Sequence, residues 1–254
     1  MISRYECTLD GIALTSLSPS IYISDINYYP PEYNQETFIP AKLQGARVVR
    51  SYKERASVTV TFQIRDYSTV MRQTICQAIV TWARDGKVLH TSDRPGQRLV
   101  CFCEQYPVIT SAMRWTDDLS ITFTALNVPY WQEDALSRLT ISGTHETGLL
   151  TVPGNAPDTV VEVTVVPQAN LSEITLKVKN TQLTLSNLGA VVGDRITITY
   201  DEQMIQSIKK NSTSILSKRT GADDLKAICG KSNEAEFTAT AACSVTFYAR
   251  GRWE

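Results

Sequence analysis

The sequence has few residues suited to acid–base catalysis, no long apolar run and no excess of charge. Only 2 of its 254 residues are histidine, and no apolar stretch reaches the roughly 18–20 residues that a membrane-spanning helix needs. The 25 lysines and arginines are balanced by 26 aspartates and glutamates. Proteins that bind nucleic acid usually carry a positive excess, because they neutralise phosphates. We therefore expect neither membrane insertion nor sequence-specific binding of nucleic acid.

The first residues, Met1–Glu6, also lack the apolar segment that directs secretion. The 6 cysteines are therefore expected to be thiols rather than disulfides, because a protein that is not exported stays in a reducing compartment. Cys101 and Cys103 are separated by one residue on a predicted strand, so both face the same side. This pattern predicts two small buried thiols and not a zinc site, which needs four ligands.

The remaining polar residues do not form a recognised catalytic pattern. His90 and His145 are distant in sequence from any cysteine or carboxylate pattern, and we expect both to be surface or hydrogen-bonded histidines. The carboxylate pairs Asp117–Asp118 and Asp223–Asp224 are typical of turns and helix caps. We predict no catalytic, metal-binding or cofactor-binding residues, no cofactor, and a protein that is not an enzyme.

The first half of the chain is rich in strands and contains one convincing helix. Residues 57–64 alternate between polar and apolar side chains, which predicts a strand with one buried face. A helix is predicted at about 68–85, capped by Asp66 or Ser68 and ended by Gly86 in the left-handed conformation. Its apolar stripe consists of Met71, Ile75, Ala78, Ile79 and Trp82.

The second half shows only strand patterns, separated by turn signals at intervals of about ten residues, which is typical of a sandwich or barrel. We predict a mainly β protein with two domains. The first spans residues 1–135, is β-rich and contains the one helix. The second spans residues 136–254 and is a β-sandwich or barrel.

A series of segments in a fixed order resembles the distal tail proteins of long-tailed bacteriophages (siphoviruses) and related prophages. The segments of the first half are Ser24–Ile26, Arg50–Arg55, Trp82–Gly86, Leu89–Pro95 and Phe123–Trp131. Those of the second half are Pro153–Pro157, Leu188, Gly193–Asp194, Ile196–Tyr200, Thr220–Leu225 and Arg250–Trp253. The match covers nearly the whole chain, and the first half carries more of it.

The resemblance implies a structural protein of the baseplate hub, found in the virion at the tail tip and made in the cytoplasm of the bacterial host. The first domain would form a homohexameric ring, or belt, that joins the tail-tube protein above to the tail-associated hub or lysin protein below. The second domain would be a galectin-like or jelly-roll β-sandwich that projects outward and carries or contacts receptor-binding proteins in host attachment. DNA would pass through the ring without being recognised.

A closed ring needs two different complementary faces on each subunit. The segment from Asn27 to Pro40 is rich in tyrosine and proline and is predicted to be an irregular loop. Its residues Tyr28, Tyr29, Pro30, Pro31 and Tyr33 are candidates for one subunit interface, because tyrosines are favoured at interfaces. A surface loop packed on its own domain is the alternative.

Three other functions are open from the sequence alone. The second domain could be a carbohydrate-binding module that recognises a glycan of the host surface, although few aromatic residues support this. The chain could be a cell-wall hydrolase carried on the tail, although no nucleophile, base or metal set supports that. A tail-tube protein is the nearest structural alternative, but such proteins usually have one domain.

Overall fold

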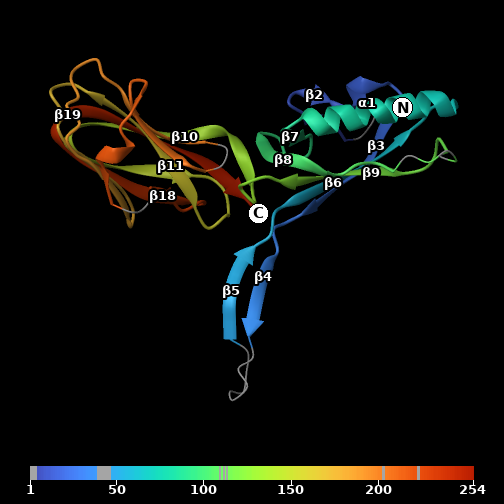
Figure 1. Cartoon of the computed structure of the whole chain (residues 1–254), viewed down its shortest axis with the longest axis horizontal. Coiled ribbons are helices and arrows are strands. Elements are labelled where there is room, and N and C mark those ends of the chain that lie inside the picture. The colour runs from blue at the N-terminus through green and yellow to red at the C-terminus, as the bar shows by residue number, and fades with distance from the viewer. Residues whose placement is uncertain are drawn as a thin grey trace. The chain divides into compact units, whose positions relative to one another are not determined.

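The computed structural model describes residues 5–38, 47–108, 110, 112, 114–201, 204–221 and 224–254, with the backbone alone for residue 33 and for strand residues 35–38 and 47–53. The chain forms two compact units, Met1–Trp131 together with Glu254, and Gln132–Trp253. Strands dominate both units, which confirms the mainly β class (Figure 1). Among the described residues the one α-helix is α1, Thr69–Asp85.

The first unit is built around strand β6, Ser57–Ile64, which pairs antiparallel with β3 on one side and β9 on the other. Val58, Val60, Phe62 and Ile64 are buried, so the predicted alternation sets one face of β6 against the core. The other elements of this unit are β1 (Cys7–Leu9), β2 (Ile12–Ala13), the 3₁₀ helix η1 (Leu14–Leu17), β3 (Ile21–Tyr29), β4 (Tyr33–Phe38), β5 (Arg47–Lys53), β7 (Val88–Thr91), β8 (Gln97–Gln105) and β9 (Leu119–Ala125).

A bulge in β3 explains why its buried residues change parity. Ile21, Ile23 and Ile26 are all buried, although the last of them has the wrong spacing for a regular strand. The pairing of β3 with β6 shifts between Ile23 and Asp25, and this one-residue shift turns Ile26 back toward the core. The strand can therefore continue as far as Tyr29 without losing its buried face.

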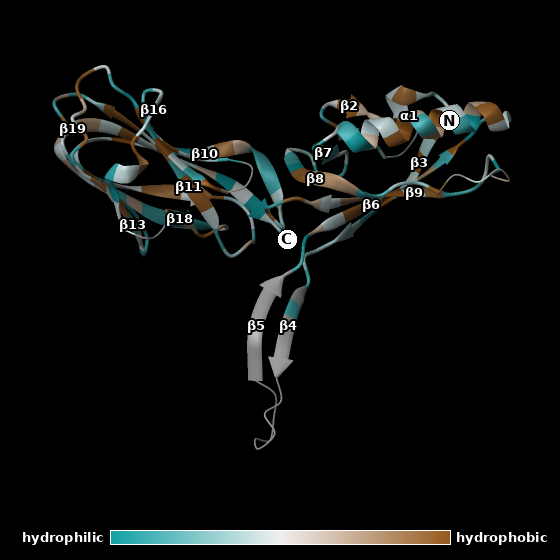
Figure 2. Ribbon diagram, viewed as in Figure 1, coloured by the Kyte–Doolittle hydropathy of each residue, from teal (hydrophilic) through white to brown (hydrophobic). Residues whose placement is uncertain are grey.

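Helix α1 begins as predicted but buries a different face. Ser68 is its N-cap, and its Oγ accepts a hydrogen bond from the Met71 amide at 3.3 Å. Ile75, Ile79 and Trp82 are buried as expected, whereas Met71 and Ala78 are exposed. Their places in the core are taken by Arg72, Cys76 and Ala83. Figure 2 shows the resulting mixture of hydrophobic and hydrophilic residues along the helix.

Trp82 is the central contact of the buried helix face. Its ring packs edge-on against Phe123 of β9, with ring centroids 5.9 Å apart. Its indole N–H donates a hydrogen bond to the Ile12 carbonyl at 3.0 Å. One side chain thus ties α1 both to the central sheet and to the N-terminal strands.

The prediction for Gly86 is wrong in its mechanism. Its backbone is extended, with φ −88° and ψ 151°, and not left-handed. Glycine is required there by space, because a Cβ atom would lie 2.1 Å from Cδ2 and 2.2 Å from Cγ of the buried Leu9. The close approach lets β7 follow the helix directly and pair with β1.

The second unit is an antiparallel β structure organised by one long strand. Strand β19, Lys231–Trp253, pairs with β12 through Ala235–Ala239 and with β11 through Cys243–Ala249. Phe237 and Phe247 lie on these two halves and are fully buried. The other elements are β10 (Trp131–Val152), β11 (Thr159–Pro167), β12 (Ile174–Val178), β13 (Thr181–Leu185), β14 (Ile196–Tyr200), β15 (Gln206–Lys210), β16 (Thr213–Ser214), the 3₁₀ helix η2 (Leu216–Lys218), β17 (Arg219–Thr220) and β18 (Lys226–Ala227).

The packing at Gly86 gives the first testable prediction. Gly86→Ala should lower the free energy of unfolding by about 1–3 kcal/mol, because the new methyl group overlaps Leu9. Leu9→Ala alone should also destabilise, by about 2–5 kcal/mol, because it empties a buried site. Urea unfolding of the double variant should show a loss at least about 1 kcal/mol smaller than the sum, because Leu9→Ala removes the atoms that clash. Additive losses would contradict this account.

Candidate assembly surfaces

Strands β3 and β6 continue into a two-stranded ribbon formed by β4 and β5. Tyr29 pairs with Ser57 before Pro30 and Pro31, and Tyr33 pairs with Lys53 after them. The register is therefore the same on both sides of the proline pair. The ladder is interrupted there because proline has no N–H to donate. The Glu54 amide donates to the Glu32 carbonyl at 2.7 Å, directly beyond the interruption.

The ribbon forms a sheet of its own, and no pairing joins it to another described strand (Figure 1). This corrects the prediction of an irregular loop between Asn27 and Pro40. The loop prediction failed because the partner strand, Arg47–Lys53, lies beyond the segment, and local composition does not reveal this pairing. Of the predicted segment, Ile39 and Pro40 lie outside the described residues.

The five predicted interface residues have different surroundings. Tyr29 is half exposed and Pro30 is exposed, so both are accessible at the base of the ribbon. Pro31 is buried, and Tyr33 begins β4, with its side chain outside the described part. Tyr28 makes its contacts within its own unit. The interface role of this segment remains a prediction.

Tyr28 belongs to a cluster that holds the end of the first unit. Its hydroxyl donates to a carboxylate oxygen of Asp93 and lies 2.9 Å from the Thr91 hydroxyl. The Arg94 guanidinium lies 4.5 Å from the centroid of the Tyr28 ring and 5.0 Å from that of Trp131. The two rings also meet edge-on, 5.6 Å apart. Cation–π contacts of this kind contribute about 0.5–2 kcal/mol each.

The cluster joins segments that are distant in sequence. Thr91 is the last residue of β7, and Asp93 and Arg94 belong to the turn that follows it. Trp131 is the last residue of the first unit before the second begins. Trp131 is buried, so the chain leaves the first unit from a fixed point. Burial raises the pKa of the Tyr28 hydroxyl, and the hydrogen bond to Asp93 raises it further.

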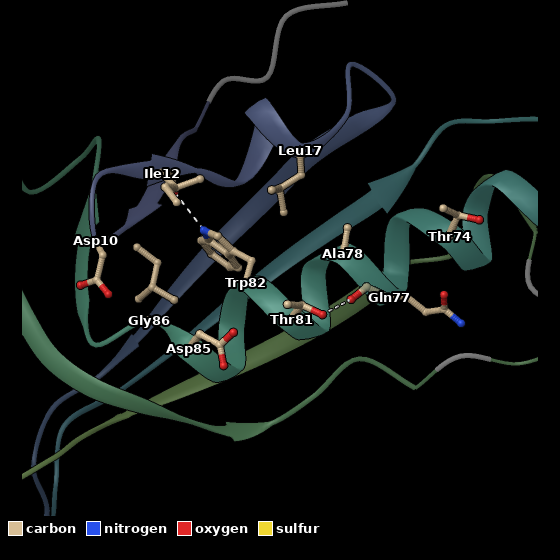
Figure 3. A pocket seen from close by; sticks show the side chains of 11 residues that line it. Asp10, Ile12, Leu17, Thr74, Gln77, Ala78, Thr81, Trp82, Asp85 and Gly86 are labelled. Atoms are coloured by element: carbon tan, nitrogen blue, oxygen red, sulfur yellow. Dashed lines mark hydrogen bonds between the residues drawn. The ribbon is translucent and has the colours of Figure 1, made fainter.

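A shallow apolar groove of about 710 Å³ lies beside the solvent side of α1 (Figure 3). Its apolar lining comes from Leu9, Ile12, Leu17, Ala78 and Trp82, and its polar edge from Asp10, Thr74, Gln77, Thr81 and Asp85. Sequence reasoning missed this groove, because it assigned Ala78 to the core. The exposure of Ile12 and Ala78 leaves apolar surface that a second protein surface can cover.

The other polar residues named from the sequence have structural contacts. His145 is exposed, and its Nδ1 lies 2.7 Å from the Thr238 hydroxyl. Asp117 accepts a hydrogen bond from the Arg114 amide, and Asp118 accepts one from Gln63. Asp223 lies outside the described residues, and Asp224 lies 3.8 Å from the Arg219 guanidinium.

The six cysteines are free thiols. Cys101 is buried, whereas Cys103 is only half-buried, which corrects the prediction that both are buried. Burial raises the pKa of Cys101 to about 12 and that of Cys103 to about 11. Within the described ranges, His, Cys, Asp and Glu form no group that could hold a metal ion. Over the same residues, no helix is both long and apolar enough to cross a bilayer.

Comparison with known proteins identifies the fold through solved structures. No protein-family model matches the chain, and no curated protein matches its sequence significantly. The SPP1 Dit protein, gp 19.1, is similar over 97% of this chain and 98% of its own, with a TM-score of 0.72 and 11% identity. The chain has the fold of a phage distal tail protein. This confirms, at the level of the fold, the resemblance found in the sequence.

Two structures of the phage P2 baseplate in its activated conformation extend the comparison. The one with Ca is 9% identical, covers 99% of this chain and 98% of its own, and has a TM-score of 0.51. The one with Sr is 8% identical, covers 98% of each chain and has the same TM-score. The SPP1 protein is described as a paradigm of the hub adsorption apparatus in phages that infect Gram-positive bacteria. Both units of the present chain therefore fall within the distal-tail fold.

The raised pKa of Tyr28 predicts a specific dependence of stability on pH. The folded protein favours the neutral phenol, so the contribution of Tyr28 is complete below the ordinary tyrosine pKa of about 10 and declines as pH rises above it. Tyr28→Phe should cost about 1–2 kcal/mol at pH 7, because Asp93 and Thr91 lose a partner. Thermal unfolding should show this difference shrinking above pH 10.

Tyr29→Phe is the matched control, because Tyr29 is the neighbouring tyrosine and is half exposed. It should change the unfolding temperature little at any pH. A Tyr28→Phe difference that stays constant up to pH 11 would contradict the role given to the cluster.

Proposed function

We propose that this chain is a structural distal tail protein, a component of the virion at the tip of a long phage tail. It joins the tail tube to the tail-tip and receptor-binding apparatus, and its role is assembly rather than catalysis. The observation that carries the proposal is the similarity of both units, end to end, to the SPP1 hub protein. Fold alone does not determine function, so features of the molecule that suit assembly matter as well.

The ribbon of β4 and β5 supports an assembly role on physical grounds. A two-stranded ribbon is marginally stable by itself in water and gains stability when it packs on another surface. It also presents two unpaired strand edges, which natural proteins usually cover. We assign the ribbon, with Tyr29 and Pro30 at its base, as one face of a contact between copies.

The groove beside α1 is the second face in this proposal. A ring closed by rotation uses two different surfaces on each subunit, and the first surface of one subunit binds the second surface of its neighbour. The ribbon is an extension and the groove is concave, so the first unit carries surfaces of both kinds. We infer a homohexameric ring, with the tail-tube protein on one side, a tail-associated hub protein on the other, and receptor-binding proteins at the second unit, which is galectin-like in this proposal.

The carbohydrate-binding alternative gains no support from the aromatic side chains of the second unit. Phe237 and Phe247 are buried in the core. The Trp253 indole donates to Glu133 at 2.8 Å, and the Arg138 guanidinium lies 5.9 Å from the Tyr248 ring centroid. These rings are engaged within the unit, whereas a sugar platform needs an open aromatic face.

Ring formation gives a direct test of the proposed function. Light scattering after size exclusion should give a mass of about 170 kDa, six times the 28.3 kDa of one chain, and negative-stain images should show a ring. The test uses the protein alone and together with the two proteins encoded beside it, because some rings close only on a neighbour. A monomer under both conditions would refute the hexamer.

The groove supplies a matched pair of variants for the same measurement. Ala78→Arg places a long cation in the groove and should shift the ring toward monomer by at least tenfold, about 1.4 kcal/mol. Gln73→Arg introduces the same side chain at another exposed position of α1 that does not line the groove, and it should leave the ring intact. Equal effects of the two variants would remove the groove from the interface.

The ribbon has its own test by hydrogen–deuterium exchange. Amides of Tyr33–Phe38 and Arg47–Lys53 should exchange at least about tenfold more slowly in the ring than in the monomer, because the contact covers the strand edges. Amides of β6 should not change, since that strand is already paired on both sides. Equal exchange of the ribbon in monomer and ring would show that it is not an interface.

A further inference from the structure

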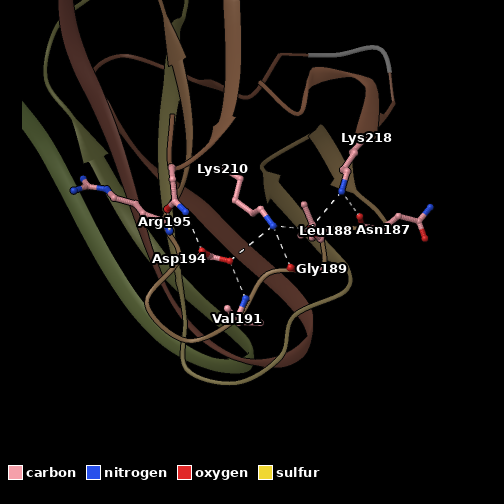
Figure 4. A network of polar contacts seen from close by, with 9 residues as sticks. Asn187, Leu188, Gly189, Val191, Asp194, Arg195, Lys210 and Lys218 are labelled. Carbon is pink, nitrogen blue, oxygen red and sulfur yellow. Dashed lines mark hydrogen bonds and ion pairs between the residues drawn. The ribbon is translucent and has the colours of Figure 1, made fainter. Parts of the chain in front are cut away.

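The loop between β13 and β14 in the second unit is held by two lysines from other elements (Figure 4). Lys218, at the end of η2, donates to the carbonyls of Asn187 and, at 3.4 Å, Leu188. Lys210, at the end of β15, donates to the carbonyls of Gly189 at 3.1 Å and Leu188 at 3.5 Å. Three consecutive carbonyl groups are thus bound by two ammonium groups.

Asp194 holds the other end of the same loop. Its carboxylate accepts hydrogen bonds from the Val191 amide at 3.0 Å and from the Asn211 side-chain amide at 2.9 Å. It also lies 3.9 Å from the Lys210 ammonium group. The hydrogen bond from Val191 is the main cause that lowers the pKa of Asp194, so the carboxylate stays charged near neutral pH.

The middle of the loop is anchored in the core. Leu188 and Ala190 are buried. Ala190 also exchanges two backbone hydrogen bonds with Leu171, at 2.8 and 3.0 Å. The loop is therefore held in place by its core contacts, by its backbone pairing and by the contacts of Lys210, Lys218 and Asp194, before it binds any partner.

The loop nevertheless presents two apolar side chains to solvent. Val191 is 49% exposed and Val192 is 66% exposed. Both are β-branched and lose little side-chain entropy when they are buried against a partner. A rigid loop with exposed apolar tips is prepared for binding, because the cost of ordering it is already met within the folded unit.

The elements at this end of the unit carry several cations. Arg195 and Lys209 are exposed, and Lys210 and Lys218 complete the set of cations at this end of the unit. Asp194 is the one acidic residue among the loop residues 187–195. The four cations outnumber this one acid, whereas the chain as a whole has a net charge of −1.

We propose that the Val191–Val192 tip is a docking site for another protein of the tail, one that offers a small apolar pocket with an acidic rim. The proposal rests on the proposed function for the identity of the partner class. Charge complementarity selects an acidic surface, and the valines supply the apolar contact at its centre. A lipid surface fits less well, because membrane-anchoring surfaces rely on Trp, Phe and Leu rather than Val.

The test measures binding of the full-length chain to each of the two proteins encoded beside it, by titration calorimetry. One of them, with net negative charge, should bind the wild type. Val191→Ser/Val192→Ser should weaken this binding by at least about tenfold, because the apolar contact is lost. Leu149→Ser is the control, since Leu149 is 67% exposed on β10 of the same unit, and it should leave the dissociation constant unchanged.

The charged rim has a separate readout in the dependence on salt. Binding of the wild type should weaken between 50 and 500 mM NaCl because salt screens the charge contacts. Arg195→Gln/Lys209→Gln should show a smaller dependence. These two residues are exposed, and their side chains are not among those that bind the loop carbonyls. The variant should therefore unfold at the temperature of the wild type.

Four outcomes would overturn the proposal. They are no binding of either protein by the wild type, an unchanged affinity in the double serine variant, loss of self-association in that variant, and valine-dependent flotation of the wild type with phosphatidylglycerol vesicles. Failure of the hub function is a separate result, because it is measured as the absence of a ring of about 170 kDa.

Discussion

The register of β6 between β3 and β9 is the constraint on which the first unit depends. A slip of one residue would turn Val58, Val60 and Phe62 toward solvent and break both ladders at once. The same register continues past Pro30 and Pro31 into the ribbon as far as the pair of Glu36 and Arg50, beyond which it shifts by one residue. Helix α1 then packs Trp82 against Phe123, a residue whose position is set by its pairing with Val58.

Each unit contains a strand that links two ladders. In the first, β8 pairs with β7 through Leu99 and Val100 and with β9 through Cys101 and Cys103, so one strand links two ladders. In the second, β19 plays the corresponding part with β11 and β12. The surfaces proposed for assembly lie outside these shared strands, on a ribbon, a helix and a loop. In the proposed assembly, binding is therefore carried by segments added to a stable strand framework.

The sequence predicts the elements whose signals are local. The alternation of residues 57–64 predicts β6 from adjacent residues alone, and the capped periodic run at 68–85 does the same for α1. The buried face of α1 was less predictable, because Arg72 is buried through hydrogen bonds to the Asp66 carbonyl and the Thr69 hydroxyl. Hydrophobic periodicity does not anticipate a buried arginine, and it assigned Ala78 to the core in place of Ala83.

The candidate surfaces depend on contacts between segments that are distant in sequence, and for that reason most of them could not be predicted from the sequence. Pairing of Tyr33 with Lys53 cannot be inferred from residues 27–40, where proline and asparagine indicate a loop. The stacking of Arg94 on Trp131 and the bonds from Lys210 and Lys218 to one loop likewise need the folded chain. The resemblance to tail proteins predicted the fold because it depends on the order of segments and not on their contacts.

The proline interruption also makes the ribbon adjustable over evolutionary time. The ribbon pairs only with itself among the described strands, so a change in its length leaves the buried ladders of β3, β6 and β9 untouched. Two residues added to each strand would lengthen it by about 7 Å and keep every side chain on its original face. Under the proposed assembly, insertion or deletion at this one place would fit the same core to neighbours of different size.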